Sequence, residues 1–365
     1  MDDVAATYPH PIIAADVRDA LSRTASLWPD LKGASVFVTG ATGFFGIWLL
    51  ETLLAGNREL SLGMRVVALS RNPKRFAAKA PHLADDVAVT WVTGEVRGFP
   101  FPAGPITHVI HAAAESTSNK NARDPQTMFD VCLEGTRRVL ALAREKRVAR
   151  MLFTSSGAVY GRQPPELSHV PEDFAGGPDP LDRHSAYAEG KRAAEFLCGL
   201  AASEPVPPVP VTIARCFAFV GPHLPLDVHF AIGNFLRDAL AGGPIRISGD
   251  GTPFRSYLYA ADLAEWLITI LLRGRPGRAY NVGSEEAVSI AELAARVADV
   301  MATEQTDRIR PKVTVAKQPV PGAAAARYVP SCRRVHAELG LVPATSLSDA
   351  IARSAAWYRP GQTRP

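Results

Sequence analysis

Tyr187 and Lys191 are the residues of this chain whose types and spacing point most directly to chemistry. They stand four positions apart in the stretch Ser185-Ala-Tyr-Ala-Glu-Gly-Lys191, so on a helix they lie one turn apart on the same face. An ammonium beside a phenol favours the phenolate and lowers the pKa of the tyrosine. We therefore predict that Tyr187 moves a proton to or from a sugar or alcohol oxygen at neutral pH.

A glycine-rich segment upstream, Thr39-Gly-Ala-Thr-Gly-Phe-Phe-Gly46, predicts the partner of that chemistry. It lies between a predicted strand and a predicted helix, the context that a phosphate-binding loop requires. Gly40 permits a tight turn, Gly43 lets the backbone approach a pyrophosphate, and Gly46 lets the helix pack close to the sheet. Amides at the helix N-terminus then receive the phosphates of a dinucleotide that carries hydride.

Length and composition set limits on the class of protein. The chain of 365 residues is too long for one compact core and indicates one large or two unequal domains. Its apolar fraction of 47% and charged fraction of 21% are ordinary for a soluble globular protein. The net charge is only +4, and the 40 lysines and arginines form no dense run. Nucleic-acid binding therefore has no support in the composition.

We expect neither a secretion signal nor a membrane span. The start, Met1-Asp-Asp-Val-Ala, is acidic and lacks a basic region followed by an apolar core. The longest near-apolar run, 263–272, contains Glu265 and is too short to cross a bilayer. The four cysteines are widely separated and include no C-x-x-C pair. That spacing indicates reduced thiols of a cytoplasmic protein, not a metal site or a disulfide framework.

Predicted strands and helices alternate through the first two thirds of the chain. This alternation indicates parallel βαβ units and an α/β fold with a doubly wound parallel sheet of the Rossmann type. Beyond Gly221 the alternation weakens, which predicts a smaller, mixed, mainly substrate-binding region with segments that return to the first domain. The expected parts are an N-terminal extension at 1–33, a dinucleotide-binding domain at 34–220 and the substrate-binding region at 221–365. Strands are predicted at 34–39, 65–70, 87–92, 108–114, 150–154 and 211–216.

The residues after the second and third strands bear on cofactor choice. An acidic residue after the second strand would select NAD, but the chain has Ser70-Arg71-Asn72 there. A serine and an arginine suit a 2′-phosphate, so NADP is slightly favoured over NAD; the alternative is that Arg71 is a solvated loop residue. Glu95, after the third strand, is either an acceptor for the adenine amine or a surface glutamate.

A pair of serines follows the fifth predicted strand, in Thr154-Ser-Ser-Gly-Ala-Val-Tyr-Gly161. The carboxyl ends of strands in such sheets point into the ligand crevice. A serine hydroxyl there can bond the same substrate oxygen that Tyr187 serves. The alternative is that the serines only cap a turn or helix.

Taken together, these motifs resemble the extended short-chain dehydrogenase/reductase family, and within it the nucleotide-sugar epimerases and dehydratases. The resemblance runs from about residue 34 to 345. The matching segments are 39–46, His111-Ala-Ala-Ala114, Ser155-Ser-Gly-Ala-Val-Tyr-Gly161, Tyr187-Ala-Glu-Gly-Lys191, Arg215-Cys-Phe-Ala-Phe-Val-Gly-Pro222, Gly249-Asp-Gly-Thr-Pro-Phe-Arg-Ser-Tyr-Leu-Tyr259 with Asp262, and Asn281-Val-Gly283.

The resemblance implies roles for particular residues. Tyr187 is the acid/base, Lys191 holds the nicotinamide ribose, and Ser156 is the hydroxyl on the substrate side. Segment 230–240 covers the nucleotide. The implied cofactor-binding residues are Gly40, Thr42, Gly43, Phe44, Phe45, Gly46, Ser70, Arg71, Glu95, Val96, Ala112, Ala113, Ala114, Tyr187 and Lys191. The implied substrate-binding residues are Ser156, Glu115, Arg255, Phe217 and Ala218.

The chain departs from the family pattern where the reaction type is decided. The 4,6-dehydratases carry an Asp-Glu pair after the hydroxyl residue, whereas this chain has Gly157-Ala158. Replacement acid/base groups would have to come from Glu189, His184 or Glu115. Asparagines common elsewhere in the family are replaced by Cys132 and Ala218. The change at Ala218 weakens the assumption that this chain makes the family's standard diphosphate contact.

These features predict an NAD(P)-dependent enzyme that modifies a nucleotide-linked sugar through a keto intermediate, with epimerisation at C4 as the best match. The alternatives are an NADPH-dependent 4-keto-sugar reductase and a sugar-nucleotide 4,6-dehydratase. A different class stays open, a dinucleotide-binding sensor or scaffold without turnover, although a binding protein has no use for the full catalytic set. The long helices at 125–147 and 186–203 resemble the family's dimer interface, so we expect a homodimer.

Tyr187→Phe is expected to abolish turnover without unfolding the protein. The change removes the hydroxyl that carries the proton, while the ring still packs. Steady-state kinetics together with a thermal melt check both halves of this expectation. Activity near the wild-type value in the variant would end the mechanism.

Overall fold

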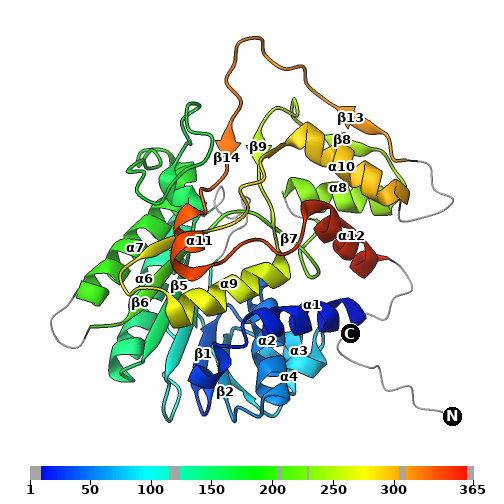
Figure 1. The fold of residues 1–365 in the computed structure, drawn as a ribbon. Helices are drawn as coiled ribbons and strands as arrows, with labels where there is room; N and C mark the ends of the chain where they lie inside the picture. The colour runs from blue at the N-terminus through cyan, green and yellow to red at the C-terminus, as the bar shows by residue number, and fades with distance from the viewer. Residues whose placement is uncertain (1–9, 115–123, 204–207, 228–229, 304–309, 360–365) are drawn as a thin grey trace, which may run out of the picture.

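The protein is described from a computed structural model, drawn as a ribbon in Figure 1. The described residues are 10–114, 124–203, 208–227, 230–303 and 310–359. Among them, no helix is long and apolar enough to cross a membrane. The same residues include no group of three or more His, Cys, Asp or Glu that is placed to hold a metal ion.

A seven-stranded sheet forms the centre of the larger part of the molecule, with strand order β11-β6-β5-β4-β1-β2-β3. Every neighbouring pair in it is parallel. The order reverses between β1 and β4, which confirms the predicted doubly wound sheet and leaves a crevice at that point. The strands are β1 (Ser35–Thr39), β2 (Arg65–Ser70), β3 (Val89–Thr93), β4 (His108–His111), β5 (Arg150–Ser156), β6 (Val211–Cys216) and β11 (Ala279–Val282).

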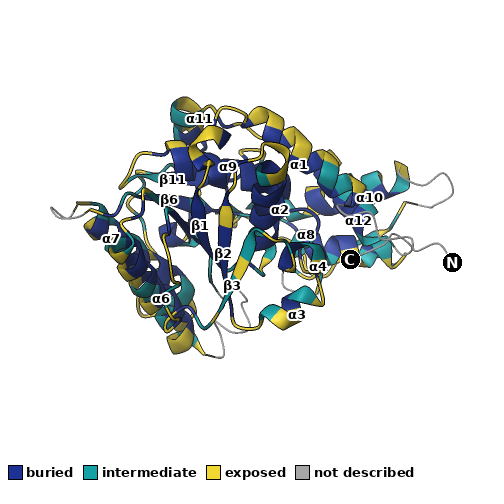
Figure 2. Ribbon diagram, turned by 90° about the horizontal axis from the view of Figure 1, so that it is seen from below, coloured by how far each residue is buried: buried dark blue, intermediate teal, exposed yellow. Residues whose placement is uncertain are grey.

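Helices cover both faces of this sheet, as Figure 2 shows from below. One face carries α2 (Phe44–Glu59) and α9 (Ala260–Arg273), and the other carries α6 (Pro125–Glu145) and α7 (Ala186–Ser203). Every residue of α9 from Ala260 to Leu272 is buried, because the N-terminal extension and the C-terminal elements pack over its outer side. Two short helices, α3 (Pro73–Ala77) and α4 (Pro81–Ala84), follow β2 and precede β3 in the sequence.

The C-terminal part is smaller and mixed, in the upper half of Figure 1. Its strands form small sheets, β10-β7, β12-β9-β14 and β13-β8. It includes α8 (Ala231–Leu240), α10 (Ile290–Thr303), α11 (Arg333–Leu339) and α12 (Leu347–Tyr358). Its strands are β7 (Phe219–Val220), β8 (Ile245–Ile247), β9 (Phe254–Arg255), β10 (Leu258–Tyr259), β12 (Val288–Ser289), β13 (Val313–Val315) and β14 (Arg327–Tyr328). β11 returns to the main sheet, while the predicted domain limits at residues 33 and 220 stay predictions.

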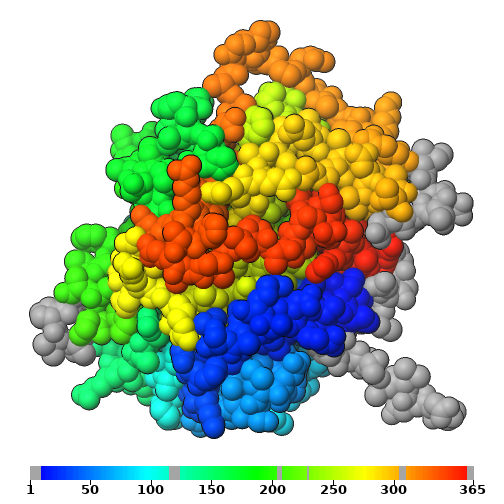
Figure 3. Space-filling model, in the orientation of Figure 1, coloured from blue at the N-terminus to red at the C-terminus, as the bar shows by residue number. Residues whose placement is uncertain are grey.

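The described part of the N-terminal extension contains a helix, α1 (Pro11–Arg23). Pro11 suits the first helical position, and the His10 side chain accepts a hydrogen bond from the Ile12 amide. Arg23 forms ion pairs with Asp262 and Glu265 of α9. In Figure 3 the extension lies against the C-terminal elements, drawn in red. The extension is therefore an integral part of the fold.

Some strand ends differ from the sequence-based limits for local reasons. β5 continues to Ser156, two residues past the expected end, because Ser155 and Ser156 pair with the last residues of β6. β3 starts at Val89, two residues late, since the Asp86 side chain accepts from the Ala88 amide in a turn. β4 ends at His111, so the alanines that follow it form a loop at the crevice.

Gly46→Ala is expected to destabilise the protein by at least about 1–3 kcal/mol. A Cβ at Gly46 would lie 2.2 Å from the Gly40 carbonyl oxygen, so the start of α2 would have to move. Gly98→Ala is the matched control, because a Cβ there meets no atom within 4 Å. Urea unfolding of the two variants measures the difference. Equal unfolding free energies would contradict the close approach.

Candidate active site

A cavity of about 940 Å³ lies along the carboxyl edge of the main sheet. Its walls come from both parts of the molecule, from the glycine loop after β1 to Tyr328 on β14. It brings together most of the residues singled out from the sequence. Those that line it are Gly40, Thr42, Gly43, Phe44, Phe45, Ser70, Arg71, Glu95, Val96, Ala112, Ala113, Ala114, Ser156, Tyr187, Lys191, Phe217, Ala218 and Arg255.

The glycine loop has the geometry that a dinucleotide pyrophosphate needs. Gly40 has a φ of +71°, and a Cβ there would lie 2.5 Å from the Ala112 carbonyl oxygen. Gly43 faces the cavity and precedes α2, whose first amides have no side-chain cap. Gly46 is not a lining residue; it packs beneath the loop, in line with its predicted packing role. The loop therefore fits a dinucleotide, with bare amides for its phosphates.

The loop after β4 is held by a buried hydrogen-bond chain. The Ala113 amide donates to Thr39 Oγ1 at 3.0 Å, and that oxygen lies 2.8 Å from His111 Nδ1. His111 Nε2 lies 3.1 Å from Thr136 Oγ1 on α6. Burial lowers the pKa of His111 to about 3, so its ring is neutral. The alanines at 112–114 are thus set at the floor of the cavity.

Ser70, Arg71 and Glu95 line the end of the cavity at β2 and β3. The hydroxyl of Ser70 accepts from the Asn72 amide at 3.2 Å, which bends the chain after β2. Glu95 accepts a hydrogen bond from Arg97 Nε at 2.8 Å. Arg97 also lines the cavity and was missed from the sequence, where no motif includes it.

On α7, Lys191 is buried and Tyr187 is half-buried, and loss of hydration shifts the pKa of both side chains. The Lys191 side chain donates to the Thr154 carbonyl oxygen at 2.7 Å, with its Nζ 5.9 Å from the centroid of the Tyr187 ring. Burial lowers the pKa of Lys191. Burial also raises the pKa of Tyr187, and neighbouring Cys132 and Tyr328 add to the rise. The pKa of Tyr187 is therefore raised where the sequence predicted a lowered value, because loss of hydration favours the neutral phenol.

The two serines at the end of β5 have different partners. Ser155 Oγ donates to Glu195 Oε1 on α7 at 2.5 Å. Ser156 Oγ accepts from the Ala158 amide at 3.1 Å and lies 3.4 Å from the phenol oxygen of Tyr328. A hydrogen bond with Ser156 also favours the charged form of Tyr187. Ser156 is thus the serine beside Tyr187, while Ser155 is held by α7.

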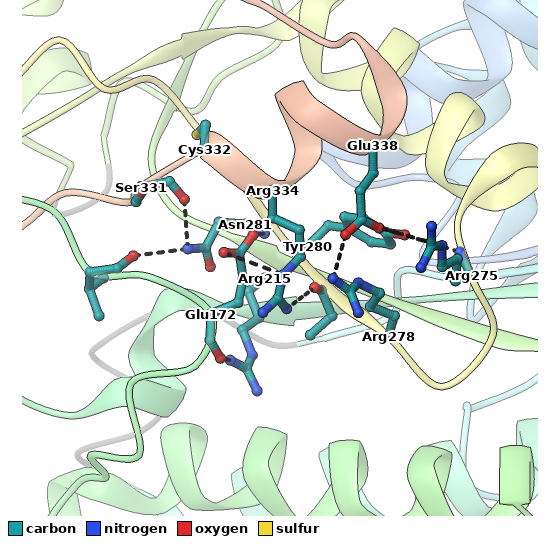
Figure 4. A network of polar contacts seen from close by, with 12 residues as sticks. Glu172, Arg215, Arg275, Arg278, Tyr280, Asn281, Ser331, Cys332, Arg334 and Glu338 are labelled. Atoms are coloured by element: carbon teal, nitrogen blue, oxygen red, sulfur yellow. Dashed lines mark hydrogen bonds and ion pairs between the residues drawn. The ribbon is translucent and has the colours of Figure 1, made fainter.

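Behind the serines lies a polar network that joins the sheet to the C-terminal segment, part of which Figure 4 draws. Arg215 pairs with Glu195 at 2.7 Å and donates to the phenol oxygen of Tyr160 at 2.9 Å. Tyr160 in turn donates to Asn281 Oδ1 at 2.7 Å. Asn281 Nδ2 donates to the Ser331 carbonyl oxygen at 3.0 Å, three residues beyond Tyr328. The network therefore sets β14 relative to β5.

The end of the cavity formed by the C-terminal part, where we expect the substrate, is aromatic and basic. Phe217, Ala218 and Arg255 line it, whereas Glu115 lies outside the described residues. Arg255 is the register partner of Tyr328 on β14. The structure adds residues that no motif pointed to, because they follow an alanine-rich stretch or lie in the C-terminal part. These are Leu224, Pro225, Ile290, Arg327 and Tyr328.

The first position of the dehydratase acid/base pair, Gly157, is closed to larger side chains, whereas Ala158 lines the cavity. A Cβ at Gly157 would lie 2.7 Å from two atoms of the Phe217 ring. His184 is exposed and lies 2.9 Å from Asp182, and Glu189 pairs with Arg192, so neither lines the cavity. Among the described residues that line the cavity, the one carboxylate is Glu95, at the end near β3.

Comparisons with known proteins agree with this geometry. The family model for the NAD dependent epimerase/dehydratase family matches residues 36–283, which confirms the family resemblance found in the sequence. UDP-glucuronic acid decarboxylase 1 of Arabidopsis thaliana is 28% identical over 90% of this chain and 70% of its own length. A dTDP-glucose 4,6-dehydratase of Streptomyces griseus is 27% identical over 88% of this chain and 93% of its own.

A solved structure shares the fold. The UDP-glucuronic acid 4-epimerase from Bacillus cereus, in complex with UDP-glucuronic acid and NAD, matches with a TM-score of 0.71 at 21% identity. The match covers 88% of this chain and 98% of that one.

Ser156→Ala is expected to lower turnover by roughly ten- to a thousandfold, the range for loss of one donor at a developing oxyanion. Ser155→Ala, the matched control, should do less, because its hydroxyl bonds Glu195. Initial rates of both variants at saturating substrate measure the two effects. A larger loss in Ser155→Ala would exchange the roles of the two serines.

Proposed function

Because the chain belongs to the NAD-dependent epimerase/dehydratase family, we propose that it epimerises C4 of a nucleotide-linked hexose through a 4-keto intermediate. The observation that carries this proposal is the cavity itself. It places Ser156, Tyr187 and Lys191 beside the glycine loop, and its described substrate end offers no carboxylate for removing water. Proton and hydride transfer are therefore the chemistry that these residues support best.

In this mechanism the bound nicotinamide supplies a hydride acceptor and donor at the sugar carbon. Tyr187 removes the proton from the C4 hydroxyl, and Ser156 donates a hydrogen bond to the same oxygen. Lys191 places a positive charge near the phenolate and reaches toward the nicotinamide ribose. Since burial raises the pKa of Tyr187, the fraction of phenolate, and with it the oxidation rate, increases with pH through the neutral range.

A second candidate is decarboxylation of UDP-glucuronic acid. Several curated relatives carry the name UDP-glucuronic acid decarboxylase, at 26–31% identity. Oxidation at C4 makes the C6 carboxylate, attached to C5, that of a β-keto acid. Loss of carbon dioxide then leaves an enolate that takes up a proton at C5, and the hydride returns to C4, with no further acid/base pair required. Arg255 and Arg327, on neighbouring strands of the substrate end, are suited to an anionic substrate. The same Tyr187 and Ser156 would serve both reactions.

Product analysis separates these reactions. The purified enzyme with cofactor is incubated with UDP-, dTDP-, CDP- and GDP-hexoses and with UDP-glucuronic acid, and products are followed by chromatography and mass spectrometry. An unchanged mass at a new retention time supports epimerisation. Loss of carbon dioxide from UDP-glucuronic acid supports the second candidate, whereas loss of water or stoichiometric NADPH oxidation overturns both. The Tyr187→Phe variant is the blank for each reaction.

NADP preference is a further part of the proposal, supported by Ser70 and Arg71 at the end of the cavity near β2. Arg71→Asp should weaken NADP binding more than NAD binding, because a carboxylate repels the 2′-phosphate that a guanidinium attracts. Calorimetric titration of wild type and variant with both cofactors measures the ratio. If the ratio of the two affinities does not change, Arg71 is a bystander, and the preference for NADP has no basis.

We also propose a cytoplasmic homodimer formed through α6 and α7. Phe196 and Leu200 of α7 are 68% and 45% exposed, a level that a second copy would reduce. The four cysteines are free and buried, as expected for a cytoplasmic protein. Sedimentation of the wild type and of Phe196→Glu tests the dimer, since a monomeric wild type would contradict it. Cell fractionation tests the location.

A further inference from the structure

Tyr328 lies beside the reacting groups, and the mechanism above gives it no task. It lines the cavity, and its phenol oxygen lies 3.4 Å from Ser156 Oγ. Its ring packs against Phe217, with the ring centroids 4.7 Å apart. A phenol in this position is the nearest polar neighbour of Ser156 from the C-terminal part of the chain.

The backbone around Tyr328 is held on two sides, so the phenol has a defined position. On one side, Tyr328 pairs in register with Arg255 of β9. On the other side, the Val329 amide donates to the side-chain oxygen of Gln163 at 2.9 Å. The Val170 amide donates to the Val329 carbonyl oxygen at 2.9 Å. The phenol therefore meets Ser156 from a fixed strand.

The hydrogen-bond capacity of Ser156 limits how its proton can point. A serine hydroxyl has one proton to donate and two lone pairs that accept. The Ala158 amide already donates to Ser156 Oγ at 3.1 Å. Burial raises the pKa of Tyr328 to about 12, so its phenol keeps its proton in the neutral range. If the phenol donates as well, both lone pairs are used and the serine proton points away from both donors.

We propose that Tyr328 is a positioning residue whose phenol donates to Ser156 Oγ and thereby commits Ser156 to donate its own proton toward Tyr187 and the sugar oxygen. The inference rests on the proposed function, because it assumes that Ser156 and Tyr187 serve one substrate oxygen. Without the phenol, one lone pair of Ser156 is free and its hydroxyl can rotate. The serine then donates to the substrate for only part of the time.

We call the hydrogen bonds from Tyr328 to Ser156, and from Ser156 toward Tyr187 and the sugar oxygen, the relay. A double-mutant cycle of Tyr328→Phe and Ser156→Ala tests it in the full-length enzyme. Tyr328→Phe keeps the ring against Phe217 and removes one donor, so kcat should fall by roughly tenfold with KM changed by less than about twofold. The double variant should be no slower than Ser156→Ala alone, because Tyr328 acts through Ser156. A wild-type kcat in Tyr328→Phe, or losses that multiply in the double variant, would overturn the proposal.

Tyr280→Phe is the matched control, since it removes a buried phenol that donates to Glu338 at 3.0 Å away from the cavity. Its kcat should equal that of the wild type. A thermal melt of each variant separates loss of folding from loss of positioning.

A second measurement is independent of turnover. In protein labelled with carbon-13 at tyrosine Cζ, the resonance of Tyr187 is assigned by its loss in Tyr187→Phe. Tyr328→Phe and Ser156→Ala should shift this resonance in the same direction, and Tyr280→Phe should leave it in place. If the chemical shift of the Tyr187 resonance does not change in Tyr328→Phe, the relay is overturned. A wild type that converts no sugar nucleotide overturns the proposed function alone, and the resonance then decides the relay.

Discussion

The partly buried ion pair between Arg215 and Glu195 is the interaction on which the geometry of the site depends. It joins the end of β6 to α7 at 2.7 Å, with both side chains largely shielded from water. Glu195 also accepts from Ser155, and Arg215 also bonds Tyr160. Loss of one partner would leave an unpaired charge with little access to water, which is destabilising. The strand β6, the helix α7 and the segment 157–160 after β5 are thus held in one arrangement.

The same arrangement restricts the chemistry at the substrate end. Phe217 follows β6 and fills the space beside Gly157, so a larger side chain at position 157 would require the Phe217 ring to move. The polar side chains nearby are phenols and a serine, which move or direct protons on an oxygen but offer no carboxyl group to protonate a leaving hydroxyl. This lining is the basis of the proposal of oxidation and re-reduction of a sugar alcohol.

The first and last helices, α1 and α12, contribute to the site indirectly, through β10 and α9. Asp16 of α1 is buried, accepts from the Tyr259 phenol at 2.5 Å and pairs with Arg353 of α12. Arg23 pairs with Asp262, whose second oxygen accepts from the amides of Ala344 and Thr345. Figure 3 shows these parts as adjoining bands. The helices α1 and α12 therefore pack against β10 and α9, which follow the cavity-lining Arg255 and Tyr257 in the chain.

Local sequence alone determined the parallel sheet, the glycine loop and the Tyr187–Lys191 helix, because each depends on spacing within one turn or one strand–loop–helix unit. The choice of Ser156 over Ser155 came from the family resemblance and stays a prediction, to which the structure adds the Ser155–Glu195 bond between residues 40 positions apart. Only the tertiary structure decided the pKa of Tyr187 and the place of Tyr328. Burial depends on everything packed around a group, and Tyr328 reaches Ser156 across 172 positions of chain. No spacing rule encodes a contact of that separation.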